Sequence, residues 1–227
     1  MKAVLLDMDG TLVDSEKLWE IALQELYDRL GAELTPEVRE STVGGSAEVV
    51  MQIVYRDLGL PSDPEAMAAT ADWLHDVAGE LFDGGLSWCE GARELLDALA
   101  DAEIPMALVT NTRRALTERA LNSIGRHYFI ASVCGDEVPN GKPAPDPYRR
   151  AAALLELEPS GCLAIEDSVA GAAAAQDAGC PVLVVPNDVV VPSGPGRRHL
   201  ASLAGLSPER LRQIYEEIYA EIHPGLR

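Results

Sequence analysis

The first ten residues constrain the fold of this chain more than any other feature. The apolar run from Ala3 to Leu6 leads straight into Asp7-Met8-Asp9-Gly10. A short apolar run that ends in this way predicts a buried central strand over residues 2 to 6 of a parallel sheet, followed by a turn that uses the conformational freedom of glycine. Ligands of open α/β sheets bind outside the carboxyl ends of the strands, so Asp7 and Asp9 are expected at a binding site.

The two carboxylates would lie only about 6 to 7 Å apart along an extended chain. Two negative charges at about 4 Å repel by roughly 4 kcal/mol at an effective dielectric of 20, and somewhat less at this larger spacing. A cation or a shared proton is therefore expected beside them. The alternative interpretation is that Asp7 and Asp9 are ordinary turn carboxylates, which cap helices and open Asx-turns.

Length and charge narrow the class of protein. With 227 residues, 47% of them hydrophobic, the chain can form one large domain or a domain with an insertion. Lys and Arg number 18 against 37 Asp and Glu, a net charge of −19, which argues against nucleic acid or membrane partners. An anionic substrate would then need a local positive site. No targeting or spanning segment is visible, so a cytoplasmic protein is expected. The oligomeric state stays open between a monomer and a homodimer.

The cysteines show neither paired metal-ligand spacing nor the density of a disulfide scaffold. Three of them sit in or beside apolar, strand-like runs, so we expect buried free thiols. The four are Cys89, Cys134, Cys162 and Cys180.

Residues 15 to 86 carry helical patterns and no strand pattern. Ser15 is expected to cap the first helix, and Gly31 to end it. Glycine or proline separates the later helices. The expected helices cover residues 15–30, 36–43, 46–58 and 63–82.

After Gly84-Gly85, strands alternate with helices. This alternation predicts an α/β fold with a right-handed, doubly wound parallel sheet, and the helical block becomes an insertion over the carboxyl edge of that sheet. The expected domains are core residues 1–14, a helical cap domain at 15–86 and the rest of the core at 87–227. Strands are expected at 105–110, 130–134, 162–165 and 182–185, helices at 91–102, 113–124, 148–157, 169–178 and 207–222, and a surface loop at 187–196.

Three more polar signals follow predicted strands. Thr110-Asn111-Thr112 offers hydroxyl and N–H groups that suit an anion, or that simply cap a helix. Lys142 lies in the proline-flanked segment Gly141-Lys142-Pro143-Ala144-Pro145, where a fixed cation would suit phosphate, although most lysines are solvated. Glu166-Asp167 could be helix caps. If they face Asp7 and Asp9, they complete an oxygen-rich site for Mg²⁺ in preference to Zn²⁺.

In this order, Asp7-Met8-Asp9-Gly10-Thr11, Thr110, Lys142 and Glu166-Asp167 closely resemble the four motifs of the haloacid dehalogenase superfamily. The resemblance spans essentially the whole chain. It implies a Rossmann-like core with the small helical cap of the β-phosphoglucomutase and phosphoglycolate phosphatase branch. Residues 197–227 form a longer C-terminal segment than is usual for this branch, and no function is assigned to them.

The resemblance also implies a mechanism. Asp7 would attack phosphorus and become an aspartyl phosphate. Asp9 would protonate the leaving oxygen and then deprotonate the attacking water. Mg²⁺ would be bound by Asp7, the Asp9 carbonyl and Asp167, with Glu166 in support.

The remaining motif residues would hold the substrate, a small phosphorylated molecule. Thr110, the N–H of Asn111 and Lys142 would bind the transferring phosphoryl oxygens. Gly10 belongs to the same substrate-binding set. Substrate identity stays open among sugar, polyol and nucleoside phosphates and phosphoglycolate.

Within the branch, two features favour a phosphatase. Sugar-phosphate mutases resemble one another in having a histidine where this chain has Trp19. The loop Val43-Gly44-Gly45-Ser46-Ala47 also lacks the arginine with which a mutase grips a second phosphate. Asp14-Ser15-Glu16 followed by Trp19 is instead similar to phosphatases of the hexitol and 2-deoxyglucose phosphate group. A β-phosphoglucomutase-like mutase remains the alternative.

Trp19, Gly44, Gly45 and Ser46 are expected to contact the substrate. Equally, Trp19 could be a core side chain of an amphipathic helix, and the Gly-Gly-Ser loop a plain turn between helices. A non-catalytic binding protein on the same scaffold is a further alternative, because fold does not fix function. The presence of all the catalytic side chains argues against it.

Overall fold

The centre of the molecule is a six-stranded parallel sheet with strand order β3-β2-β1-β4-β5-β6. It is seen in a computed structural model that describes residues 1–187 and 189–223. The sheet confirms the predicted α/β fold, with the predicted first strand in the middle. The strands are β1 (Ala3–Leu6), β2 (Met106–Val109), β3 (Ala131–Val133), β4 (Cys162–Glu166), β5 (Val182–Val184) and β6 (Arg197–His199).

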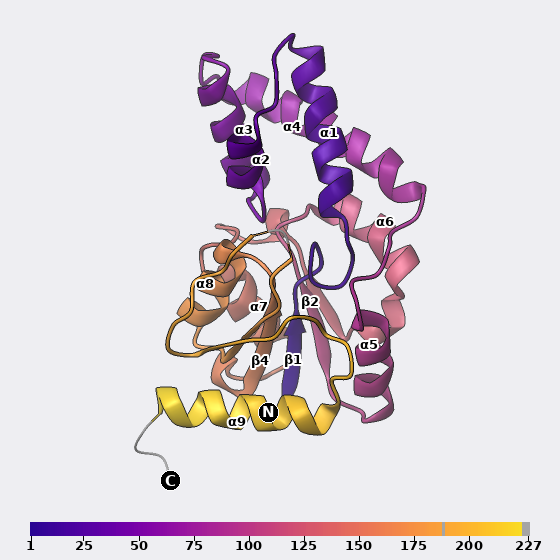
Figure 1. The fold of residues 1–227 in the computed structure, drawn as a ribbon, viewed down its shortest axis with the longest axis vertical. Coiled ribbons are helices and arrows are strands. Elements are labelled where there is room, and N and C mark those ends of the chain that lie inside the picture. Colours follow the sequence, from indigo (N-terminus) through magenta and orange to yellow (C-terminus); the bar gives the residue numbers. More distant parts are fainter. Residues whose placement is uncertain (188, 224–227) are drawn as a thin grey trace.

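Both faces of the sheet are buried under helices, which explains why its central strands are apolar runs. Val4 and Leu6 of β1 point into one hydrophobic cluster, while Ala3 and Leu5 point into the other. Figure 1 shows α7 and α8 on one side of the strands, α5 and α6 on the other, and α9 across the end of the sheet near the N-terminus. These helices are α5 (Ala92–Asp101), α6 (Arg114–Ile124), α7 (Asp146–Leu154), α8 (Val169–Ala178) and α9 (Pro208–Ile222).

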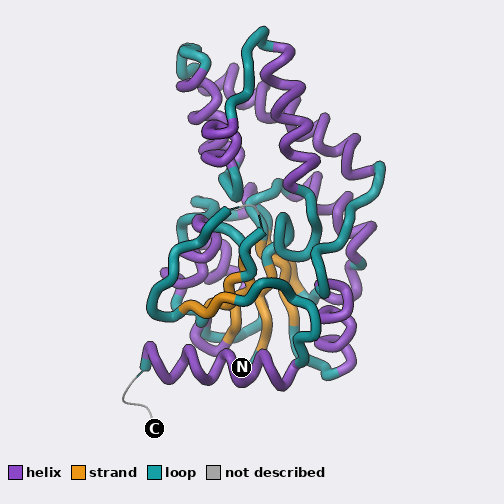
Figure 2. Tube along the Cα trace, viewed as in Figure 1, coloured by secondary structure: helices purple, strands orange, loops and turns teal. Residues whose placement is uncertain are grey.

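Four further helices between β1 and α5 form a helical insertion beyond the carboxyl ends of the strands (Figures 1 and 2). Within it, α1 and α3 pack against α4, and α2 packs against α3. Helix α4 also contacts α6 of the core. The helices are α1 (Glu16–Arg29), α2 (Pro36–Thr42), α3 (Ala47–Asp57) and α4 (Pro64–Asp83).

Local sequence sets where the later helices of the insertion begin. Prolines occupy the first position of α2 and α4, where a missing N–H costs nothing. The hydroxyl of Thr35 accepts from the N–H of Val38, and that of Ser46 accepts from the N–H of Val49. Ser15 differs from the prediction, because its side chain makes no capping bond to α1.

The chain enters and leaves the insertion at neighbouring points. Val13 pairs with Trp88 in an isolated antiparallel bridge. The N–H of Asp14 donates to the carbonyl of Ser87 at 2.9 Å, and the N–H of Cys89 donates to that of Leu12 at 3.0 Å. The two connecting segments are therefore tied to each other.

The C-terminal segment is where the sheet departs from the prediction. Residues 197–199, for which no strand was predicted, form the edge strand β6, which is paired with β5. Helix α9 then packs on β5 and β6. In the predicted loop 187–196, residue 188 lies outside the described residues, as do residues 224–227 of the C-terminal segment.

Two smaller expectations concern the cysteines and membranes. All four cysteines are free thiols; Cys134, Cys162 and Cys180 are buried, and Cys89 is half-buried. Burial raises the pKa of the Cys134 thiol to about 11.

In the described part of the chain, no helix has both the length and the apolar character needed to cross a bilayer.

Candidate active site

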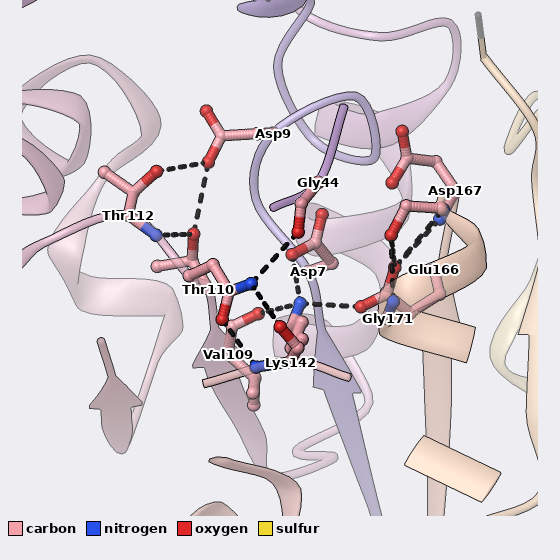
Figure 3. A network of polar contacts seen from close by, with 12 residues as sticks. Asp7, Asp9, Gly44, Val109, Thr110, Thr112, Lys142, Glu166, Asp167 and Gly171 are labelled. Atoms are coloured by element: carbon pink, nitrogen blue, oxygen red, sulfur yellow. Dashed lines mark hydrogen bonds and ion pairs between the residues drawn. The ribbon is translucent and has the colours of Figure 1, made fainter. Parts of the chain in front are cut away.

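Three strand ends bring the predicted polar residues together. Asp7 directly follows β1, Thr110 follows β2, and Glu166 ends β4 with Asp167 next in sequence. Because β1 lies between β2 and β4, the three ends are neighbours at one edge of the sheet. Figure 3 shows these side chains converging there with Lys142.

Lys142 is the buried cation of the cluster, with a side chain that is 2% exposed. Its ammonium group forms ion pairs with Asp7 and with Glu166, the latter at 2.6 Å, and donates to the carbonyl of Val109 at 2.8 Å. Burial disfavours its charge, but attraction by Asp7 and Glu166 outweighs burial and raises the pKa of Lys142. The lysine is therefore held protonated inside the site.

Glu166 fixes the position of this lysine. It is completely buried, and its Oε1 also accepts from the hydroxyl of Tyr148 at 2.6 Å. Its Oε2 accepts from the N–H of Asp167 at 3.2 Å and from the hydroxyl of Ser168 at 3.1 Å. Gly171 packs so closely against this carboxylate that a Cβ there would lie 1.9 Å from Oε1.

The acidic groups outnumber the cations in this cluster. Oxygens of Asp7, Glu166 and Asp167 lie within 4.8 Å of one another, and all three residues are buried. Burial, followed by repulsion from Glu166, raises the pKa of the Asp7 carboxyl well above its ordinary value. Burial and the charge of Asp7 do the same to the pKa of Asp167. One ammonium against three carboxylates leaves an excess of negative charge that a hard cation would neutralise.

Asp9 lies beside this cluster and is held by hydrogen bonds from four side chains. Its Oδ2 accepts from the hydroxyls of Thr110 at 3.1 Å and Thr112 at 2.8 Å. Its Oδ1 accepts from Ser15 at 2.6 Å and from the indole N–H of Trp19 at 3.2 Å. Two donors come from the core and two from the start of the insertion, so Asp9 is oriented by both parts.

Asn111 connects the insertion to the lysine loop. Its side-chain amide donates to the carbonyls of Gly44 and Lys142, each at 3.0 Å, and its oxygen accepts from the N–H of Lys142 at 2.7 Å. Gly44 has a φ of +67°, and a Cβ there would lie 2.9 Å from the side chain of Ser168. The loop can approach the core this closely because the residue is glycine.

A cavity between the insertion and the core contains most of the predicted site residues. Of the predicted set, Asp7, Asp9, Trp19, Gly44, Gly45, Thr110, Asn111, Lys142 and Asp167 line it. The others lie around it: Glu166 is behind Lys142, and Ser46 begins α3 as its capping residue. Gly10 packs behind Asp167, where a Cβ would lie 2.1 Å from Oδ2.

The cavity also contains three residues that were not among the predicted site residues, although Glu16 belongs to the Asp14-Ser15-Glu16 segment that is similar to phosphatases. Glu16, Arg39 and His75 line it from three different helices of the insertion. No spacing rule links Arg39 or His75 to the strand-end motifs, so only the packing of the insertion brings these two side chains to the cavity. Thr112 carried a signal, because it belongs to the Thr110-Asn111-Thr112 segment, but its bond to Asp9 was not foreseen.

Comparison with known proteins identifies a family for this chain and relatives that are phosphatases. The family model described as haloacid dehalogenase-like hydrolase matches residues 1–179. The chain is 31% identical over 217 residues to a probable pseudouridine-5'-phosphatase from Drosophila melanogaster, covering 90% of each chain. It is 28% identical over 221 residues to a phosphorylated carbohydrates phosphatase from Thermotoga maritima, covering 96% of this chain and all of that protein.

Among solved structures, the fold is similar to that of a β-phosphoglucomutase from Clostridium difficile. The TM-score is 0.83, with 21% identity, over 96% of this chain and 98% of that one. At this identity the likeness concerns the fold alone.

Proposed function

We propose, on the basis that this chain belongs to the haloacid dehalogenase-like hydrolase family and is one of its phosphatases, that it hydrolyses a small phosphomonoester. The proposed reaction requires Mg²⁺ and proceeds through a phosphorylated Asp7. The substrate is a sugar, polyol or related phosphate. The observation that carries the proposal is the placing of Asp7 beside a buried lysine and two further buried acids at the floor of a cavity.

The donor set fits Mg²⁺. Asp7 and Asp167 would hold the ion together with the main-chain oxygen of Asp9, while Glu166 supports the site by positioning Lys142. Oxygen donors without nitrogen or sulfur suit a hard divalent cation. When bound, Mg²⁺ neutralises charge on the carboxylates and on the transferring phosphoryl group.

In the first step, an oxygen of Asp7 forms a bond to phosphorus as the bond from phosphorus to the leaving oxygen breaks. Asp9 donates a proton to that leaving oxygen, which departs as an alcohol. Lys142, Thr110 and the N–H of Asn111 hold the phosphoryl oxygens, so stabilisation of charge is supplied by groups that are already in place.

In the second step, Asp9 removes a proton from a water molecule whose oxygen attacks phosphorus. The bond between phosphorus and Asp7 breaks, which releases inorganic phosphate and restores both carboxyl groups to their starting states. Asp9 can serve both steps because four side chains fix its carboxylate.

Residues 15–86 act as a cap that closes the site and contacts the leaving group. Support comes from the cavity, which the helical insertion and the core line together, and from the bond between Asn111 and Gly44. Trp19 favours a phosphatase over a phosphomutase, because it stands where sugar-phosphate mutases resemble one another in having a histidine. Its indole N–H donates to Asp9, and its ring has edge contacts with His75 and Phe82.

The direct test is phosphate release by the wild type and by Asp7→Asn. Wild-type protein with Mg²⁺ is expected to release phosphate from p-nitrophenyl phosphate and from sugar and polyol phosphates, and a chelator should stop the reaction. Asp7→Asn should lower kcat by about a thousandfold or more, because the nucleophile is lost. Acid-quenched wild type should give a phosphorylated peptide that contains Asp7.

Asp14→Asn is the matched control, since Asp14 pairs with exposed Lys17; its activity should stay close to that of the wild type. Circular dichroism shows whether both variants fold. Normal turnover by folded Asp7→Asn would reject the mechanism. Isomerisation of β-glucose 1-phosphate without phosphate release would instead identify a mutase.

A further inference from the structure

The part of the cavity lined by the helical insertion is mostly apolar. Three ionisable side chains interrupt it: Glu16 from α1, Arg39 from α2 and His75 from α4. The groups proposed to bind the phosphoryl group belong to the core. The three ionisable side chains of the insertion therefore face the part of a phosphomonoester that leaves as an alcohol.

Arg39 and Glu16 form an ion pair in the part of the cavity that the insertion lines, which is called the insertion wall below. Nη2 of Arg39 donates to Oε2 of Glu16 at 2.6 Å and to the main-chain oxygen of the same residue at 2.9 Å. The two side chains are 15% and 5% exposed. A pair with so little contact with water is weakly screened, so the attraction between its two charges is strong. Because the opposite charges lie side by side, their fields largely cancel at a ligand elsewhere in the cavity.

Arg39 also has an N–H group that the ion pair does not use. Its Nε is buried and has no hydrogen-bond partner among the residues that the structure describes. A buried N–H without an acceptor is unfavourable, and an oxygen atom of a ligand would satisfy it. The arginine thus offers a hydrogen bond while its net charge is already compensated.

His75 offers the complementary group. Its Nδ1 lies 2.7 Å from the carbonyl of Ala71, which can only accept, so Nδ1 carries the proton. Burial lowers the pKa of His75, and this effect outweighs the opposing effect of the hydrogen bond to Ala71. The ring is therefore neutral near pH 7, and its Nε2 is an acceptor for a hydroxyl group.

The sum of the formal charges in the insertion wall indicates which class of leaving group fits it. Glu16 contributes −1, Arg39 contributes +1 and neutral His75 contributes nothing, so the wall has no net charge. A carboxylate or second phosphate would meet Glu16, and among the insertion residues that line the cavity the one cation, Arg39, is already paired. An uncharged hydroxyl group would find both a donor and an acceptor, and the ring of Trp19 beside His75 would pack against carbon atoms.

We propose that the Glu16–Arg39 pair makes this enzyme select phosphomonoesters with uncharged, hydroxyl-bearing leaving groups and discriminate against leaving groups that carry a second anion. This inference rests on the proposed phosphatase function. Arg39 binds the leaving group, and Glu16 is a positioning residue that fixes and neutralises it.

Glycerol 3-phosphate and 3-phosphoglycerate provide the test, because they differ by a CH₂OH group in place of a carboxylate. The wild type should show kcat/KM at least about tenfold higher for glycerol 3-phosphate, the factor that one charge-assisted contact supplies. Glu16→Gln exposes the charge of Arg39 to the ligand and should narrow this ratio by about tenfold, mainly through the KM for 3-phosphoglycerate. Arg39→Gln leaves Glu16 unbalanced and should widen the ratio.

Glu20→Gln is the matched control, because Glu20 is exposed on the same helix and the substitution removes the same charge. It should leave the ratio unchanged. Equal kcat/KM for the two esters in the wild type would overturn the inference, and so would an unchanged ratio in folded Glu16→Gln. If Glu16→Gln does not fold, the wild-type ratio and Arg39→Gln decide. Absence of phosphate release from both esters and from p-nitrophenyl phosphate would reject the proposed function itself.

Discussion

At the scale of single residues, Asp9 shows how the two parts of the molecule share one functional group. Its carboxylate accepts from Thr110 and Thr112 of the core and from Ser15 and Trp19 of the insertion. Hydrogen bonds from both sides fix the side chain in one orientation. In its proposed role as general acid and base, Asp9 would depend on such positioning as much as on its acidity.

Trp19→Phe tests this arrangement. The substitution removes the indole N–H that lies 3.2 Å from Asp9 but keeps an aromatic ring next to His75 and Phe82. Loss of one hydrogen bond to a carboxylate should lower kcat about tenfold. Steady-state kinetics on p-nitrophenyl phosphate measures the effect, and Trp73→Phe, on α4, is the control. Equal kcat for Trp19→Phe and the wild type would show that the other three donors suffice.

The sequence allows the core residues of the candidate site to be predicted. Of the cavity lining that the insertion contributes, it allows only Trp19, Gly44 and Gly45 to be predicted. Asp7, Thr110 and Asp167 each follow an apolar strand, and the edge of a parallel sheet must gather such residues. Glu16, Arg39 and His75 lie on amphipathic helices. Helical periodicity shows which face of each helix is buried, but it does not show which faces of different helices meet.

At the scale of elements, Arg114 joins the start of α6 to the end of β3. Its guanidinium group donates to both carboxylate oxygens of Glu137, at 3.0 and 2.8 Å, and to the carbonyl of Ser132 at 3.0 Å. The hydrogen bonds from Arg114 lower the pKa of Glu137 below its ordinary value of 4.5. The planar, two-pronged geometry stabilises the loop next to Thr110.

Glu137→Gln should therefore show a pH-dependent loss of stability. A carboxyl whose pKa is lowered on folding stabilises the protein above its unfolded pKa, and this contribution disappears as the pH falls through the folded pKa. Urea unfolding should give a difference of about 1 kcal/mol between wild type and variant at pH 7. The difference should shrink below about pH 4.5. A constant difference down to pH 3 would contradict this account.

Most helices and strands lie within a few residues of their predicted positions, because their apolar periodicity matches one kind of element. The exception is β6. Its residues Arg197, Arg198 and His199 are polar and half-buried, so they lack an apolar pattern. The strand exists because its main chain pairs with β5 at the edge of the sheet. Pairing of this kind depends on tertiary structure and leaves no signal in local sequence.

At the scale of the whole molecule, the distribution of charge opposes the proposed chemistry. The chain carries a net charge of −19, while the phosphoryl group would be held at the floor of a cavity by one buried lysine and a bound cation. A phosphate ester approaching from solution meets repulsion before it reaches these local attractions.

The rate at low substrate concentration should consequently rise with salt. Raising potassium chloride from 10 to 150 mM shortens the screening length from about 30 to about 8 Å. At fixed Mg²⁺, kcat/KM should increase severalfold, because long-range repulsion is screened more than contacts inside the cavity, while kcat should change little. A fall in kcat/KM with salt would mean that the field at the cavity entrance is positive and that this explanation is wrong.

The bridge between Val13 and Trp88 holds the two ends of the helical insertion together, which would allow the insertion to be exchanged as one unit. Its two ends leave the core side by side, so an evolving lineage, or a protein engineer, can replace the whole segment without cutting any strand of the sheet. The carboxylates proposed to perform the chemistry would be inherited unchanged, while the side chains proposed to select the leaving group would be replaced. Ser15 and Trp19 limit this freedom, since any replacement must again supply donors to Asp9. Gly44, which accepts a hydrogen bond from Asn111, and α4, which contacts α6, limit it further.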